Sequence, residues 1–326
     1  MARSSKSISD DCSALAFYGI RPSPKAAEDF YHAMVEWFGR LGHPPDKGGV
    51  TAPGFGTQLG SFQRLNAKLA KKGFRKVTGV TLVATTPGAE YWESDCYASA
   101  CYMGDDDELT AYIVARSSVA TLSATSLLPV AREVAQLLKP VYGIGYTRSH
   151  RLDAGFYAIG LNFDPGDLTA EELEEQEWIG TWGETLFEDQ VYRKGILRDV
   201  YPWNFLTRPH LKKKVVGVSL EQWIRQNTRR GRLSEFGRGM HLWEVAEKHI
   251  SAVRQTLLRA GLILEPEEDD YVDPEINAEE GLAVVFRTFG VSPEDMIVFD
   301  GTGKKIPTDE VKKIVKRGGQ KRTGKK

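Results

Sequence analysis

Cysteine is scarce in this chain, and long apolar segments are absent. Only three of the 326 residues are cysteines, Cys12, Cys96 and Cys101. So small and odd a number argues against a disulfide framework and fits a reducing compartment. The first ten residues lead into no apolar stretch of a secretory signal, and no run approaches the roughly 18 apolar residues that a membrane helix needs. The sequence therefore predicts a cytoplasmic protein without a membrane partner.

Recognisable catalytic and cofactor-binding motifs are also missing. The sequence has no Gly-x-Ser-x-Gly elbow, no histidine pair at metal-ligand spacing on a predicted helix, and no zinc-type cysteine pair. Gly143 and Gly145 lack the third glycine and the following helix of a dinucleotide fingerprint, and residues 301–304 lack the spacing of a P-loop. We therefore predict no catalytic residues, no metal and no cofactor, and expect a binding protein rather than an enzyme.

The residues that are present alternate between helix and strand patterns. Hydrophobic residues make up 41% of the chain and charged residues 27%, as in globular proteins that can bury a full core. Cys96 and Cys101 fall in one strand pattern, where their odd spacing predicts opposite faces. Helices are predicted over residues 24–41, 62–72, 124–138, 168–187, 220–226 and 249–260, and strands over 14–20, 77–84, 96–103, 109–115, 141–147, 155–162 and 240–245. This mixture predicts an α+β (mixed α/β) fold in which helices cover a sheet.

Composition divides the chain into a core and a C-terminal part. After residue 264 the chain becomes acidic and proline-containing, with few large apolar side chains, which is typical of a linker. Further on, residues 300–303 have the composition of a hairpin turn. The predicted parts are a flexible N-terminus (1–13), a core (14–264) of two similar-sized halves (14–140 and 141–264), an acidic linker (265–280), a small C-terminal extension (281–317) and a basic disordered tail (318–326).

The net charge of −1 hides a strong asymmetry. Residues 304–326 carry a net charge of +8, which leaves −9 for the rest of the chain, and residues 164–192 contain ten acids without a single Lys or Arg. So dense a negative helix would attract a basic protein partner; the alternative is a solvated helix face with no partner. The predicted partner-binding residues are Asp164, Asp167, Glu171, Glu172, Glu174, Glu175, Glu177, Trp178, Trp182 and Glu184.

The basic tail is a candidate for nucleic-acid contact. Clustered cations bind phosphates by releasing counterions, although no aromatic residue lies among them to stack on bases. A solubilising extension is the alternative. The predicted contact residues are Lys312, Lys313, Lys316, Arg317, Lys321 and Arg322.

An aromatic stretch over residues 201–205 is flanked by acid and base side chains. Asp199, Trp203, Arg208 and His210 could line a pocket in which these groups meet. The alternative is a packed loop whose Trp and Phe fill the core.

A succession of motifs between residues 143 and 261 resembles a known group of proteins. The motifs are Gly143-Ile-Gly145-Tyr146, Gly155-Phe-Tyr157-Ala-Ile-Gly160, Gly195-Ile-Leu-Arg198-Asp199-Val-Tyr201-Pro202-Trp203-Asn204, His210-Leu211, Leu220-Glu-Gln-Trp223-Ile224, Gly231-Arg-Leu233, Leu242-Trp243-Glu-Val245 and Val253-Arg254. Their order resembles the immunity proteins of bacterial polymorphic and type VI secretion toxin systems, over roughly residues 14–264. The residues after Leu264 do not match this pattern.

The resemblance implies a non-enzymatic inhibitor that neutralises a cognate toxin by stoichiometric binding. A toxin that acts on nucleic acid is basic where its substrate binds, so the acidic helix would suit it. Two other hypotheses remain open. One is an accessory subunit of a nucleic-acid-directed bacterial defence complex that uses the basic tail, and the other is an enzyme with its site near Asp199, Arg208 and His210.

Overall fold

The computed structural model describes residues 11–53, 55, 59–85, 94–102, 108–162, 168–237, 239–264, 298–299, 305–309 and 311–313. The predicted acidic linker and basic tail lie outside these residues, as do residues 1–10 of the predicted flexible N-terminus; its residues 11–13 belong to the first strand. Within the predicted extension, β13 (Val298–Phe299) pairs antiparallel with β14 (Lys305–Ile306). The two strands of the predicted hairpin therefore pair, while its turn residues 300–303 lie outside the described part.

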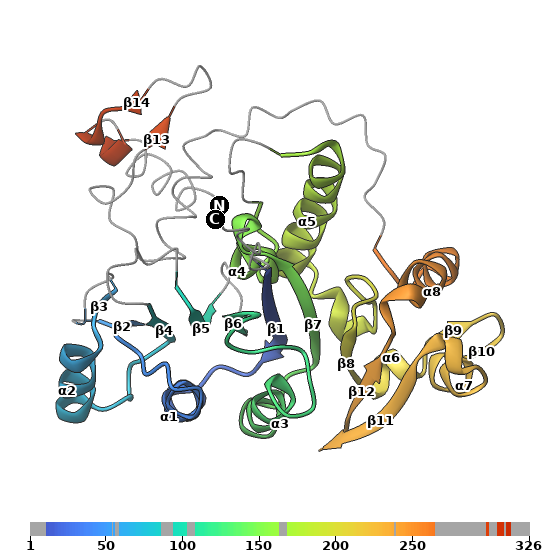
Figure 1. Cartoon of the computed structure of the whole chain (residues 1–326), viewed down its shortest axis with the longest axis horizontal. Helices are drawn as coiled ribbons and strands as arrows, with labels where there is room; N and C mark the ends of the chain where they lie inside the picture. Colours follow the sequence, from blue (N-terminus) through green and yellow to red (C-terminus); the bar gives the residue numbers. More distant parts are fainter. Residues whose placement is uncertain are drawn as a thin grey trace, which may run out of the picture.

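One antiparallel sheet of ten strands forms the centre of the fold (Figure 1). Its order is β11-β12-β8-β7-β1-β6-β5-β4-β2-β3. The strands are β1 (Asp11–Ile20), β2 (Lys47–Thr51), β3 (Gly60–Ser61), β4 (Gly79–Ala84), β5 (Cys96–Tyr102), β6 (Leu109–Arg116), β7 (Tyr142–Ser149), β8 (Trp203–Thr207), β11 (Arg232–Gly237) and β12 (Met240–Glu244). A separate short pair joins β9 (Lys214–Val215) and β10 (Val218–Ser219). Strands with helices on the sheet faces are the α+β architecture that the sequence predicts.

The first strand, β1, lies in the middle of this sheet. Phe17 is opposite Ala111 of β6 on one side and Gly143 of β7 on the other. A single sheet therefore runs through both predicted halves of the core, 14–140 and 141–264. Gly143 is required for close packing, because a Cβ there would lie 2.7 Å from Cδ1 of Phe17.

Helices cover both faces of the sheet. On one face lie α1 (Pro24–Arg40), α2 (Phe62–Lys72) and α3 (Leu127–Leu138); Leu15 and Phe17 of β1 join their core. The other face packs the alternate residues Ala16 and Tyr18 against a second core. The elements on or around that face are α4 (Ala154–Ala158), α5 (Ala170–Glu188), α6 (Arg208–Leu211), α7 (Leu220–Arg225), α8 (Glu247–Arg259), η2 (His150–Leu152), η3 (Val191–Lys194) and η4 (Thr228–Arg230).

Local sequence signals account for several helix boundaries. Ser23 caps α1 by accepting a hydrogen bond from the N–H of Ala26, and Pro24 occupies its first turn, so the helix begins at residue 24 as predicted. The predicted helix over 62–72 matches the bounds of α2. Cys96 and Cys101 of β5 pack on opposite faces of the sheet and form no disulfide, as predicted.

Other sequence expectations about local structure are wrong. Residues 155–162, predicted as a strand, begin with α4, because the carboxylate of Asp153 accepts hydrogen bonds from the N–H groups of Gly155 and Phe156 and starts a helix. The stretch 201–205 is partly the strand β8 rather than a loop, although Trp203 and Phe205 fill the core as the packed-loop alternative predicts. The helical spacing of Leu173 with Trp178 and Trp182 predicts that Leu173 points inward, but the structure leaves it 56% exposed.

Among the described residues, no helix is both long and apolar enough to cross a membrane.

Candidate functional site

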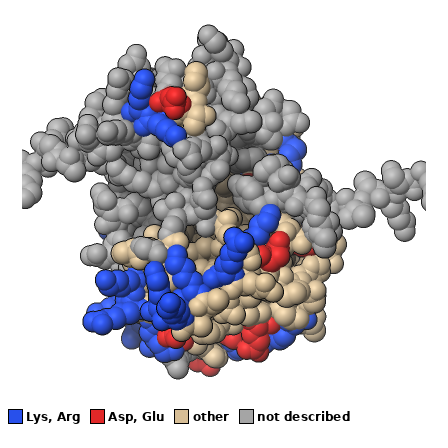
Figure 2. Space-filling model, turned by 90° about the vertical axis from the view of Figure 1, so that its left-hand side faces the viewer, with Lys and Arg blue, Asp and Glu red and all other residues tan. Residues whose placement is uncertain are grey.

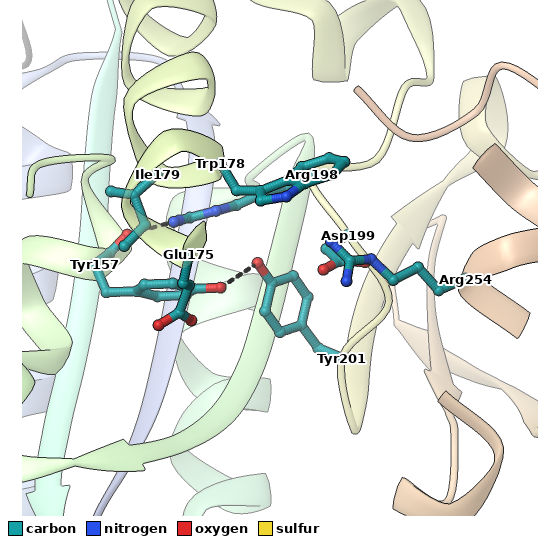
Figure 3. A pocket seen from close by; sticks show the side chains of 8 residues that line it. All are labelled: Tyr157, Glu175, Trp178, Ile179, Arg198, Asp199, Tyr201 and Arg254. Carbon is teal, nitrogen blue, oxygen red and sulfur yellow. Dashed lines mark hydrogen bonds and ion pairs between the residues drawn. The ribbon is translucent and has the colours of Figure 1, made fainter. Parts of the chain in front are cut away.

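A cavity of about 250 Å³ opens where four segments from the middle and end of the core meet (Figure 3). Tyr157 comes from α4, three residues come from α5, three from the segment before β8, and Arg254 from α8. The full lining is Tyr157, Glu175, Trp178, Ile179, Arg198, Asp199, Tyr201 and Arg254. Its volume suits one residue-sized group, since pockets for drug-sized ligands begin at roughly 300 Å³.

The segment before β8 is anchored at both ends. The N–H of Leu197 donates to the carbonyl oxygen of Leu262 at 2.8 Å. At the other end, the buried side chain of Asn204 accepts from the N–H of Tyr201 at 3.0 Å and donates to its carbonyl oxygen at 2.6 Å. Arg198, Asp199 and Tyr201 are therefore presented from a fixed backbone.

Arg198 is a buried cation with no carboxylate partner among the described residues. Its side chain is 5% exposed, and Nη1 donates to the carbonyl oxygen of Tyr157 at 2.6 Å. The guanidinium lies over the ring of Tyr157, 4.0 Å from the ring centroid (Figure 3). It also lies 5.6 Å from a ring centroid of Trp182. Nη2 is buried and has no hydrogen-bond partner in the described part of the chain. A buried, unpaired charge costs several kcal/mol, so this donor is suited to an anionic or acceptor-rich group brought by a ligand.

Two tyrosine hydroxyls meet beside this arginine. The Oη atoms of Tyr157 and Tyr201 are 2.8 Å apart, and both side chains are buried. Burial raises the pKa of Tyr157 and raises that of Tyr201 well above its usual value. Both hydroxyls are therefore neutral near pH 7, where they act as hydrogen-bonding groups rather than as proton carriers.

Glu175 of α5 is paired inside the chain. Its Oε2 lies 2.6 Å from Nη1 of Arg148, a buried residue of β7 whose guanidinium also lies 4.5 Å from the ring centroid of Tyr157. The helix that carries most of the acids is thus joined to the sheet by a charge-assisted hydrogen bond.

Asp199 and Arg254 form the second internal pair. Arg254 Nε lies 3.0 Å from Oδ1 of Asp199, and its guanidinium is 4.6 Å from a ring centroid of Trp178. Burial raises the pKa of Asp199; the nearby Arg254 and the N–H of Val200 oppose this shift. Both acids of the lining, Glu175 and Asp199, therefore form ion pairs with arginines. Among the described lining residues, the positive charge of Arg198 is left without an opposite charge.

The predicted pocket of Asp199, Trp203, Arg208 and His210 does not form. Asp199 lines the cavity, but Trp203 packs in the core on the other sheet face and Arg208 is exposed. His210 is fully buried with its ring stacked on Tyr142, and burial lowers its pKa to about 4. Because these groups do not converge, the hypothesis of an enzyme site at Asp199, Arg208 and His210 is wrong in its geometry.

The acidic helix is partly neutralised. Glu172 forms an ion pair with Arg151 of η2, and Glu175 forms one with Arg148. The sequence predicts that these carboxylates have no compensating cation, and for these two residues that prediction is wrong. Trp182 is buried in the core, where a partner cannot contact it, whereas Trp178 lines the cavity. Asp164 and Asp167 lie outside the described residues, as do the side chains of Glu171, Glu174, Glu177 and Glu184.

The predicted nucleic-acid contacts of the tail are described only at its start. Lys312 and Lys313 are exposed, and Lys316, Arg317, Lys321 and Arg322 lie outside the described residues. Within the described part of the chain, no group of three or more His, Cys, Asp or Glu side chains is arranged to hold a metal ion.

The cavity contains residues that sequence reasoning did not select as a site. Arg198, Tyr157, Tyr201 and Arg254 were visible only as members of three separate motifs, at 155–160, 195–204 and 253–254. The structure brings these motifs together around one space. All three motifs belong to the set that resembles immunity proteins, and this was the one indication in the sequence that they could act together. The order of residues does not show that the motifs meet in space.

The fold is similar to that of a solved structure, "Pseudomonas aeruginosa T6SS protein PA0821". The TM-score is 0.51 at 11% sequence identity, with 78% of this chain and 73% of that chain covered. At this identity the likeness shows a shared fold. No protein-family model matches the sequence, and a search of curated proteins finds no match.

Proposed function

We propose that this chain is a non-enzymatic, immunity-type binding protein that neutralises a cognate toxin by seating part of it over the cavity between α5 and α8. The observation that carries the proposal is Arg198, a buried cation whose Nη2 lacks a partner among the described residues in a cavity whose acids are already paired. Such a site is preorganised to receive a group, because its own contacts fix it before the partner arrives.

The chemistry of the lining favours binding over catalysis. The tyrosines keep their protons near pH 7, arginines stay charged, and both carboxylates are held in ion pairs. The described lining therefore offers fixed charges and hydrogen-bonding groups, which suit the binding of a partner group. The solved structure with the similar fold is named as a type VI secretion system protein, which supports the same biological setting.

The partner group that enters the cavity is a carboxylate or a comparably acceptor-rich group. It would lie against the Arg198 guanidinium, with the Tyr157 and Tyr201 hydroxyls as neighbours and Trp178 at one side. The cavity accepts one such group, while the exposed surface of α5 contacts the rest of the toxin. Acidic residues of α5 would then steer a basic partner toward the site.

Co-expression with the toxin encoded beside this gene tests the proposal. The wild-type chain should restore growth and co-purify with the toxin at 1:1 stoichiometry. Arg198→Gln should weaken binding by about 30-fold or more, since losing one side of a buried charged contact costs about 2 kcal/mol at least. Trp178→Ala should also weaken binding to the toxin, and it does so without removing a buried charge.

Arg225→Gln is the matched control, because Arg225 is exposed on α7 and pairs only locally with Glu221. Thermal melting of every variant separates lost binding from lost folding. Undiminished toxicity in cells that hold an excess of folded wild-type chain would refute the proposal. Protection at far below equimolar amounts would refute stoichiometric inhibition and indicate turnover.

A further inference from the structure

A second surface, at the β2–β3 edge of the sheet and away from the cavity, is strongly basic. Residues 47–85 contain seven Lys or Arg and no Asp or Glu, in a chain whose overall charge is −1. Lys and Arg side chains gather on the side of the molecule that carries α2 (Figure 2). We call this surface the basic face; it comprises Lys47, Arg64, Lys68, Lys71, Lys72, Arg75 and Lys76.

Helix α2 presents its cations along one face. Positions 64, 68, 71 and 72 fall on the same side of a helix, beside Leu65 and Leu69, which pack into the core. Lys71 and Lys72 also suit the negative end of the helix dipole. The helix dipole does not explain Arg64, which lies at the start of α2, or Arg75 and Lys76, which follow the helix.

Four cations of the basic face are available to an outside partner. Arg64, Lys71, Arg75 and Lys76 are exposed, and none of the ion pairs between described residues involves them. Two others are held in place on Phe55: Lys68 Nζ lies 4.7 Å and Lys72 Nζ 5.2 Å from its ring centroid. Lys68 also donates to the carbonyl oxygen of Phe55 at 2.7 Å.

The residue types favour phosphates over a protein surface. Five of the seven cations are lysines, which are depleted at protein–protein interfaces, whereas point-charge ammonium groups are common phosphate binders. A membrane-binding helix would need large apolar side chains beside its cations. The large apolar residues of α2 are instead partly or fully buried: Phe62, Leu65 and Leu69.

We propose that the basic face binds nucleic acid through its phosphate backbone, independently of base sequence. Sequence independence follows because contacts to phosphates carry no base information. The nearby aromatic rings of Phe55, Phe62 and Phe74 are partly buried against the core and offer no platform for stacking unpaired bases. This site is separate from the cavity and does not depend on the toxin-binding proposal. It differs from the predicted tail site because it lies on the folded sheet edge.

Fluorescence anisotropy with a labelled 20-base-pair DNA duplex tests the proposal on the full-length chain. If four cations contact phosphates, raising KCl from 50 to 150 mM should lower the association constant by about 50-fold. The variant Arg64→Gln/Lys71→Gln/Arg75→Gln/Lys76→Gln should bind at least about tenfold more weakly at 50 mM and lose most of the salt dependence. A duplex of unrelated sequence should bind equally well.

Two matched variants each remove two Lys and two Arg elsewhere. One is Lys212→Gln/Lys214→Gln/Arg225→Gln/Arg229→Gln, at exposed positions near α6 and α7; the other is Lys316→Gln/Arg317→Gln/Lys321→Gln/Arg322→Gln, in the tail. Both should retain binding within about threefold of the wild type. The proposal is overturned if the wild-type chain shows no salt-sensitive binding, if either matched variant loses as much affinity as the α2 variant, or if poly-glutamate displaces the duplex as well as unlabelled DNA does.

Discussion

Gly180 and Gly183 lie less than one turn apart in α5, and we predict that alanine has opposite effects on stability at these two positions. A Cβ at Gly183 would lie 2.2 Å from the carbonyl oxygen of Gly160, a backbone atom that cannot move aside cheaply. At Gly180 the nearest neighbour of a Cβ is Nδ2 of Asn162, at 3.9 Å. The two sites therefore share a helix and differ in the space that the tertiary structure leaves.

The magnitudes follow from two opposing effects. Alanine is favoured over glycine in a helix by about 1 kcal/mol, so Gly180→Ala should raise the free energy of unfolding by about that amount. At Gly183 the same gain is outweighed by a steric cost at the upper end of the roughly 1–3 kcal/mol of overpacking. Gly183→Ala should therefore lower the free energy of unfolding by about 2 kcal/mol.

Urea unfolding followed by tryptophan fluorescence measures both variants against the wild type. A separation of about 3 kcal/mol corresponds to a difference in Tm of roughly 6–12 °C. An unchanged m-value would show that the two-state comparison is valid. If both variants are stabilised by similar amounts, α5 does not pack on the backbone of Gly160, and the reasoning is refuted.

Two further predictions concern the interior. Burial lowers the pKa of His210 to about 4, so the folded state prefers the neutral ring; this stability is complete above pH 6.5 and is lost as the pH falls toward 4. When the pH is lowered from 7.5 to 5, the free energy of unfolding measured in urea should fall by about 2 kcal/mol more for the wild type than for His210→Gln. Equal decreases would contradict the lowered pKa of His210. Gly143→Ala should lower the free energy of unfolding by about 1–3 kcal/mol, because its Cβ would meet Phe17 at 2.7 Å and the carbonyl oxygen of Ala16 at 2.9 Å; an unchanged Tm would show that β1 and β7 are not this close.

The candidate site depends on how the sheet brings distant segments together. Tyr142 of β7 accepts a hydrogen bond from the N–H of Arg198, which is 56 residues later in the chain. Arg198 in turn donates to the carbonyl oxygen of Tyr157. The unmatched cation is therefore supported by the sheet beneath it and by α4 beside it, and this support preorganises the cavity.

Features that depend on neighbouring residues could be predicted from the order of amino acids. The Ser23-Pro24 start of α1, the bounds of α2 and the position of the acidic helix follow from capping, periodicity and helix propensity. The opposite orientation of Cys96 and Cys101 follows from strand geometry alone. The α+β class follows from the mixture of these elements, because each must bury one face against another.

The pairing of charges, in contrast, is set by long-range packing. Glu172 and Glu175 have no compensating cation near them along the chain, but Arg151 and Arg148 reach them from 21 and 27 residues away. The cavity likewise depends on motifs that are brought together by strand order, which local periodicity does not encode. Pairing between distant segments is set by burial of the whole sheet, so the site could be recognised only once the segments were in place.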